Sequence, residues 1–223
     1  MADFDAVLLD IDGTLLDSTY HHALAWSRAF ADAGHPVPTW RLHRLIGMGG
    51  DRLMPAATDE ETADRIGEEV QQRWEAAYDE MIDRTGLLPG ARELLEGLRA
   101  AGLEVVLASS SIPKHADHAL RLLQAGERAD AWTTAEDAGE SKPHPELLDR
   151  AMERVAASRA LMVGDATWDV VAARQRGIPT IGLRCGGFGA GELREAGAVA
   201  VYDDPADLLD HLEEALREAA ARR

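Results

Sequence analysis

Two kinds of apolar pattern alternate along the chain. Short apolar runs predict buried strands, and they lie at 7–11, 103–108, 160–163, 180–183 and 198–201. Between them, apolar side chains recur at helical spacing in segments 91–101, 116–124 and 145–155. Short buried strands separated by amphipathic helices are typical of a parallel sheet covered by helices on both faces. The pattern therefore predicts an α/β fold.

Residues 18–87 interrupt this rhythm, because they carry only helical patterns. Ala23, Trp26 and Phe30 share one helix face, and apolar residues between 66 and 81 share another. We predict a core domain of residues 1–17 and 88–223, with a helical cap domain of residues 18–87 inserted after the first strand. A cleft between two such units commonly holds a small ligand.

Composition narrows the possible functions of this chain of 223 residues with a formal net charge of −17. An acidic surface disfavours nucleic acid as a partner. The single cysteine, Cys185, excludes an internal disulfide framework and a multi-cysteine zinc site. No apolar run reaches the ~18 residues of a membrane span, and the acidic N-terminal residues differ from a signal peptide. We expect a cytoplasmic protein without a membrane partner.

The first candidate motif, Asp10 to Thr14, ends the first predicted strand, at the strand edge where parallel sheets bind ligands. Asp10 and Asp12 are two residues apart, so an extended chain places both carboxylates on one side. A bound Mg²⁺ would offset their burial, since hard cations prefer oxygen ligands. One carboxylate could then attack while the other moves a proton. The alternative is an acid that caps a helix or a solvated turn.

Three further polar motifs follow predicted strands or precede helices. Ser109 and Ser110 could hold a phosphate oxygen, although serine is also a common helix cap. Lys142 is one of only two lysines, and its compact charge suits contact with a phosphate; the alternative is a solvated loop lysine. Asp165 could share a cation with Asp10, and Asp169 could support it, or merely cap a helix.

Taken in this order, the motifs resemble the haloacid dehalogenase superfamily, in its branch with a helical cap after the first strand. The resemblance rests on 10–18, on Ser109, on Lys142-Pro143 and on 164–169, and it spans essentially the whole chain. The segment 186–197 is similar to the phosphoglycolate-phosphatase-like branch. The fold implied is a Rossmann-like parallel sheet with a helical cap.

The resemblance implies a Mg²⁺-dependent phosphatase for a small phosphorylated metabolite, phosphoglycolate or a sugar phosphate. Asp10 would attack phosphorus and form an aspartyl-phosphate, while Asp12 protonates the leaving oxygen and later activates water. Asp10, Asp12 through its carbonyl oxygen, Asp165 and Asp169 would form the metal site. The residues implied around the phosphoryl group are Gly13, Thr14, Ser109, Ser110 and Lys142.

The cap would set specificity, because the core would contact only phosphate. Its candidate contacts with the leaving group are His22, Gly49, Gly50 and Arg52, together with Trp26, Arg44 and Met48. His22 and Trp26 also fit a structural place at the core of the cap. Two alternatives stay open: a β-phosphoglucomutase-like isomerase, and a non-catalytic protein that only accepts or binds a phosphoryl group. A monomer and a homodimer are both compatible with the sequence.

Overall fold

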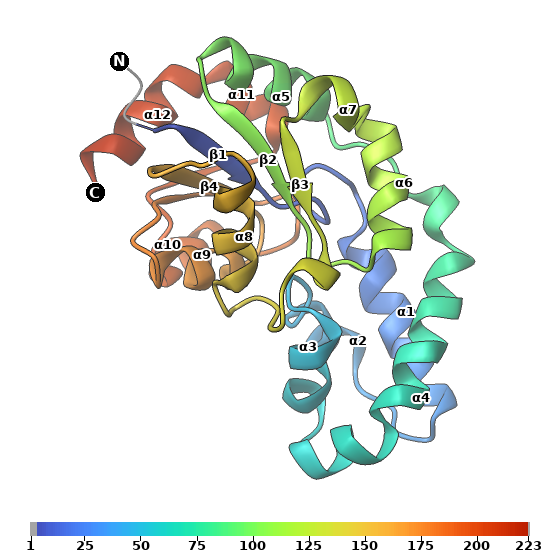
Figure 1. Cartoon of the computed structure of the whole chain (residues 1–223). Coiled ribbons are helices and arrows are strands. Elements are labelled where there is room, and N and C mark those ends of the chain that lie inside the picture. Colours follow the sequence, from blue (N-terminus) through green and yellow to red (C-terminus); the bar gives the residue numbers. More distant parts are fainter. Residues whose placement is uncertain (1–3, 223) are drawn as a thin grey trace.

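The computed structural model describes residues 4–222, in which six parallel strands form one sheet in the order β3-β2-β1-β4-β5-β6 (Figure 1). The chain first builds the sheet outward from β1 through β2 to β3, and then returns to the other side of β1 for β4, β5 and β6. The direction of building therefore reverses beside β1, where open α/β sheets bind their ligands. The strands are Ala6–Leu9 (β1), Glu104–Ala108 (β2), Ala131–Thr133 (β3), Ala160–Gly164 (β4), Thr180–Leu183 (β5) and Ala200–Tyr202 (β6).

Helices cover both faces of the sheet because alternate strand residues point to opposite sides. On one face, Val7 and Leu9 pack with apolar residues of α5, α6, α11 and α12. On the other face, Leu8 and Met162 pack with α8 and α9. The core helices are Ala91–Ala100 (α5), Pro113–Leu123 (α6), Ala125–Arg128 (α7), Glu146–Arg154 (α8), Thr167–Arg174 (α9), Ala190–Ala196 (α10), Pro205–Asp210 (α11) and Leu212–Ala221 (α12), with a short 3-10 helix at Ala135–Asp137 (η2).

The segment 18–87 forms a helical insert with an apolar core of its own, beyond the carboxyl ends of the strands (Figure 1). Its helices are Thr19–Asp32 (α1), Thr39–His43 (α2), Gly50–Ala57 (α3) and Glu60–Asp79 (α4), followed by Ile82–Arg84 (η1). The outgoing and returning chains pair, since Leu88 N–H donates to Leu15 O and Asp17 N–H donates to Gly86 O. The division into two domains at these positions stays a prediction.

The predicted α/β class is confirmed, and each predicted strand is present within two residues of its expected bounds. Sequence reasoning missed β3, a three-residue strand at the sheet edge whose first two residues are not buried. Unlike the predicted strands, this segment does not lie in an apolar run of the sequence. Among residues 4–222, no helix combines the length and the apolar character that crossing a membrane requires.

Candidate active site

The register of three strands brings the predicted motifs together. Leu9, the last residue of β1, pairs with Leu107 of β2 and Val163 of β4. The chain therefore leaves all three strands at the same edge, and Asp10 N–H still donates to Val163 O at 3.0 Å. Ser109 and Asp165 follow their strands at the corresponding place. Convergence of the motifs, which the sequence only predicted, is a consequence of this parallel register.

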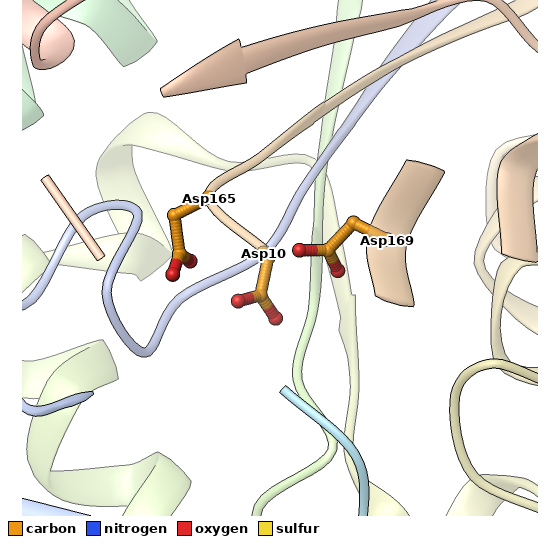
Figure 2. Close-up of side chains that lie close together, drawn as sticks. All are labelled: Asp10, Asp165 and Asp169. Carbon is orange, nitrogen blue, oxygen red and sulfur yellow. The ribbon is translucent and has the colours of Figure 1, made fainter. Parts of the chain in front are cut away.

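Three carboxylates gather at this edge, as Figure 2 shows. One oxygen from each of Asp10, Asp165 and Asp169 lies within 4.8 Å of the others, and all three residues are buried. Asp10 and Asp165 come from strand ends, whereas Asp169 extends from α9. Burying three carboxylates together is costly unless cations accompany them.

Lys142 supplies one of those cations and is completely buried. Its Nζ donates to Asp10 Oδ1 at 2.5 Å and to Ala108 O at 3.1 Å, and it lies 2.8 Å from Asp169 Oδ1. Burial alone would lower the pKa of Lys142, but Asp10 and Asp169 raise it above its usual range, so the ammonium stays charged. Asp169 thus holds the lysine against Asp10.

A single lysine leaves the cluster with excess negative charge. Burial raises the pKa of Asp10 to about 7, against the opposing effect of Lys142, and burial with the charge of Asp10 raises the pKa of Asp165. The raised pKa values show that ionising both Asp10 and Asp165 is unfavourable, because the cluster lacks enough positive charge to compensate. The oxygen-only donor set and this charge deficit fit a divalent hard cation.

Asp12 lies in a different environment, although it is only two residues from Asp10. Its carboxylate accepts hydrogen bonds from Ser18 Oγ at 2.6 Å and Ser111 Oγ at 2.7 Å, and His22 Nε2 lies 3.2 Å away. Burial would raise the pKa of Asp12, but the charge and hydrogen bond of His22 and the two hydroxyls lower it below its usual range. Two neighbouring carboxyls with pKa values shifted in opposite directions can take different chemical roles.

The remaining core residues support this arrangement. Thr14 Oγ1 donates to Asp165 Oδ1 at 2.8 Å, and Ser109 Oγ accepts from Ser111 N–H at 3.0 Å. Gly13 has φ +90°, and a Cβ atom there would lie 2.5 Å from Asp165 Oδ2. Glycine is therefore required at this turn, because both the backbone conformation and the space exclude a side chain.

The helical insert forms the opposite wall of the pocket that contains Asp10 and Asp12. Its contribution is mostly apolar and aromatic, and it comprises His22, Trp26, Ile46, Gly47, Met48, Gly49, Gly50 and Trp74. The loop 47–50 lies close to the core, since a Cβ atom on Gly49 would lie 2.1 Å from Ser141 Oγ. The structure thus brings the predicted residues Gly49 and Gly50 to the pocket.

The predicted arginines lie elsewhere. Arg52 pairs with Glu140 and Asp51, and it is not among the residues that line the pocket. Arg44 pairs with Glu192, and its guanidinium carbon lies 3.9 Å from the ring centroid of Phe188. Both ion pairs with glutamate join the insert to the core. A role for Arg52 in binding the leaving group stays a prediction.

His22 was predicted either to contact the leaving group or to be a structural residue of the cap, and its position has features of both. Its ring is buried and stacks on Tyr78, with the ring centroids 3.9 Å apart, yet its Nε2 faces Asp12. Sequence reasoning assigned no role to Ser18, which lies in the segment 10–18, or to Ser111, which follows Ser109 and Ser110. Trp74 was seen only as part of a helical face. Their positions depend on how the insert packs on the core, which no local pattern reveals.

Comparison with known proteins agrees with this geometry. The sequence model described as haloacid dehalogenase-like hydrolase matches residues 4–177. The chain belongs to this hydrolase family. It is 31% identical to a phosphoglycolate phosphatase of Pseudomonas savastanoi pv. phaseolicola, over 89% of this chain and 76% of that protein. It is 29% identical to a phosphorylated carbohydrates phosphatase of Thermotoga maritima, over 95% of this chain and all of that one.

A solved structure shows the same fold at higher identity. The crystal structure of a hydrolase from Pseudomonas syringae superposes with a TM-score of 0.88 at 36% identity, and covers 94% of this chain and 98% of the other. These matches confirm the predicted family and the phosphatase class of this haloacid dehalogenase-like hydrolase. The metal, the covalent mechanism and the substrate are matters for the proposal below.

Proposed function

We propose that this haloacid dehalogenase-like hydrolase is a Mg²⁺-dependent phosphatase of small phosphorylated metabolites that acts through an aspartyl-phosphate on Asp10. The observation that carries the proposal is the contrast between two carboxyls in one pocket. Asp10 lies against Lys142 and the acidic cluster, whereas Asp12 lies two residues away among proton-donating groups. A nucleophile and a proton-transfer group are thus held beside the same cavity.

In the first half of the reaction, a carboxylate oxygen of Asp10 attacks phosphorus. The new Asp10 O–P bond forms as the bond between phosphorus and the ester oxygen breaks, and Asp12 donates its proton to the departing oxygen. The depressed pKa of Asp12 opposes this role in the free protein. A phosphoryl dianion beside Asp12 would raise that pKa, because a like charge disfavours ionisation.

In the second half, water attacks the phosphorus of the aspartyl-phosphate and Asp12 accepts its proton. The Asp10 O–P bond breaks, which restores the Asp10 carboxylate and yields inorganic phosphate. An ionised Asp12 held by Ser18 and Ser111 suits this basic role. The lowered pKa keeps Asp12 ionised, and the hydrogen bonds from the two hydroxyls fix the orientation of its carboxylate.

Lys142 and a divalent cation would neutralise the charge that spreads over the phosphoryl oxygens during transfer. We assign the metal to Asp10 and Asp165, with the carbonyl oxygen of Asp12 and support from Asp169, because these residues surround the charge deficit. When bound, Mg²⁺ supplies electrostatic stabilisation and orients the phosphoryl group. Asp169 in addition holds Lys142 in place.

The lining of the pocket weighs against the mutase alternative. A phosphosugar mutase binds a sugar bisphosphate, whose second phosphate needs its own cationic partner. Among the described residues, no lysine or arginine lines the wall that the insert contributes. Hydrolysis of a monophosphate makes no such demand.

The proposal is tested by release of inorganic phosphate from a panel of phosphate monoesters, with and without Mg²⁺. We expect Mg²⁺-dependent turnover, and a loss of at least about 1,000-fold in Asp10→Asn, since the nucleophile is removed. Asp17→Asn is a matched control, because Asp17 is exposed and lies in the same motif. Turnover by Asp10→Asn close to that of Asp17→Asn would contradict the nucleophile assignment.

A further inference from the structure

The two walls of the pocket would contact different parts of a substrate, the phosphoryl group and the leaving group. The core wall carries Asp10 and Asp12, with Lys142 buried against Asp10, and it faces the phosphoryl group in the proposed function. The insert wall faces the leaving group. This wall contains Trp26, Ile46, Met48 and Trp74, and its polar side chain, His22, is already engaged with Asp12.

Among the described residues, no lysine or arginine side chain of this wall could pair with a negatively charged leaving group. Within residues 4–222, the pocket lining includes no arginine or lysine, and Arg44 and Arg52 are paired with Glu192 and Glu140. A carboxylate or a second phosphate placed here would be desolvated beside Asp10 and Asp12 without compensation. Burying an unpaired charge is strongly unfavourable.

Trp26 and Trp74 instead form an aromatic surface. Their rings are stacked, with centroids 4.9 Å apart and an angle of 17° between planes. A sugar or cyclitol ring presents apolar C–H groups on its faces and hydroxyls around its edge. The C–H face of such a ring complements the electron-rich face of an indole.

Two residues that line the pocket carry a buried polar group without a partner within residues 4–222. The indole Nε1 of Trp74 and Oγ of Ser110 are buried and have no hydrogen-bond partner among the described residues. An indole N–H can only donate, so Trp74 requires an acceptor oxygen. Leaving such groups unpaired is unfavourable, and a bound hydroxyl would relieve this cost.

From these observations we infer that the substrate's leaving group is an uncharged polyhydroxylated ring, a sugar or cyclitol, which packs on Trp26 and Trp74 and accepts a hydrogen bond from Trp74 Nε1. Phosphoglycolate and other phosphorylated carboxylates are then poor substrates. The inference rests on the proposed function and selects one class among its substrates. It differs from the activity after which the phosphoglycolate phosphatase relatives are named, and the composition of the insert wall is the reason.

The test compares kcat/KM for a hexose phosphate, an inositol phosphate, phosphoglycolate and phenyl phosphate, all with Mg²⁺. We expect at least one ring phosphate to exceed phosphoglycolate by tenfold or more, on the order of what an unmatched polar group costs in specificity. Phosphoglycolate as good as both ring phosphates would overturn the inference alone. No hydrolysis of any ester, phenyl phosphate included, would overturn the proposed function and this inference with it.

Two variants locate the effect in the insert wall. Trp74→Phe retains an aromatic side chain but removes the indole N–H. We expect kcat/KM to fall about tenfold for the preferred sugar or cyclitol phosphate and to change little for phenyl phosphate. Equal losses for both substrates would contradict a hydrogen bond to the ring. Met48→Lys adds a cation to the wall and should raise kcat/KM for phosphoglycolate severalfold.

The matched control for Met48→Lys is Leu24→Lys, which adds the same charge on an exposed position of α1 outside the pocket. It should leave phosphoglycolate hydrolysis unchanged. This pair of variants also serves if Trp74→Phe does not fold. A failure of Met48→Lys to exceed Leu24→Lys on phosphoglycolate would overturn the claim that missing positive charge excludes this substrate.

Discussion

The two walls of the pocket are built by different means. On the core wall, Asp10 follows β1, which pairs in parallel with the strand that precedes the buried Asp165, so backbone register fixes where the two carboxylates meet. On the insert wall, Trp26 and Trp74 come from α1 and α4, and their stacking depends on helix packing. The core wall is charged and suits chemistry on a phosphoryl group. The insert wall is aromatic and suits discrimination between leaving groups.

This contrast explains how one core can support hydrolysis of many esters. Strand register tolerates little variation, because a shift of one residue would turn every side chain of the strand to the other face. A packed helical wall accepts apolar substitutions of similar volume more easily. Substrate preference can therefore change in the insert while the reacting groups stay in place.

Apart from the loss of the nucleophile Asp10, the largest expected effect comes from removing Lys142, the cation buried against the core wall. Lys142→Met should lower kcat by about 100–1,000-fold, since a positive group beside the phosphoryl site is lost. It should also destabilise the protein by about 3–5 kcal/mol, because Asp10 and Asp169 are left buried without their partner. Steady-state kinetics and urea unfolding measure the two effects.

The other lysine provides the control. Lys114 is exposed and pairs with Glu75 and Asp79, so Lys114→Met should cost less than about 1 kcal/mol and should leave kcat unchanged. Similar losses of stability in the two lysine variants would contradict the view that the buried cation is required by the acidic cluster.

The second prediction concerns the metal and has opposite signs with and without Mg²⁺. Asp165 has a raised pKa, so Asp165→Asn should not destabilise the metal-free protein and should relieve repulsion with Asp10. Mg²⁺ at 100 times its Kd should stabilise the unmodified protein by about 2.7 kcal/mol, because it binds only the folded state. Thermal unfolding with EDTA or Mg²⁺ measures both.

In Asp165→Asn, we expect most of the shift caused by Mg²⁺ to disappear, while Asp17→Asn should retain it. A full Mg²⁺ shift in Asp165→Asn would remove this residue from the metal site. A large destabilisation of its metal-free form would instead indicate that Asp165 serves chiefly to hold Thr14, to which it is hydrogen bonded.

The smallest expected effect is on the pH dependence of stability, and it concerns His115, which packs against Trp74 of the insert wall. His115 of α6 is buried, its Nε2 lies 3.0 Å from Asp79 Oδ1, and its ring meets Trp74 edge to face. Burial lowers the pKa of His115 despite Asp79. The unfolded chain therefore takes up a proton first as pH falls through about 6.5, and stability declines toward acid.

This decline cannot exceed about 1.4 kcal/mol per pH unit for one proton, and His115→Gln should reduce it. Urea unfolding between pH 5 and pH 8 compares the two proteins. An unchanged slope in the variant would show that other groups cause the pH dependence, and it would leave His115 as a packing residue of the aromatic wall.

The sequence predicted the core wall far better than the insert wall, for a physical reason. Asp10, Ser109 and Asp165 each end a strand, so a local pattern locates them and parallel pairing brings them together. The small number of lysines in the chain pointed to Lys142. The sequence of its loop did not indicate that the side chain is completely buried between two aspartates. The edge strand β3 was missed because its three residues do not lie in an apolar run, as those of the equally short β6 do.

Prediction of the insert was limited to its helices. The helical faces of Trp26 and Trp74 were apparent, yet which of these side chains reach the pocket depends on long-range packing. The same limit applies to Arg52, whose sequence neighbourhood suggested contact with the leaving group, whereas the structure pairs it with Glu140. Ser18 and Ser111 became meaningful only when both were seen to donate to Asp12.

The central claim is that Asp10 carries the phosphoryl group between the two halves of the reaction. The most direct measurement is a rapid acid quench during turnover, followed by borohydride reduction and peptide mass spectrometry. We predict homoserine at position 10, the product of reducing an aspartyl-phosphate. Full turnover with position 10 unmodified, or modification at another acid, would contradict the account.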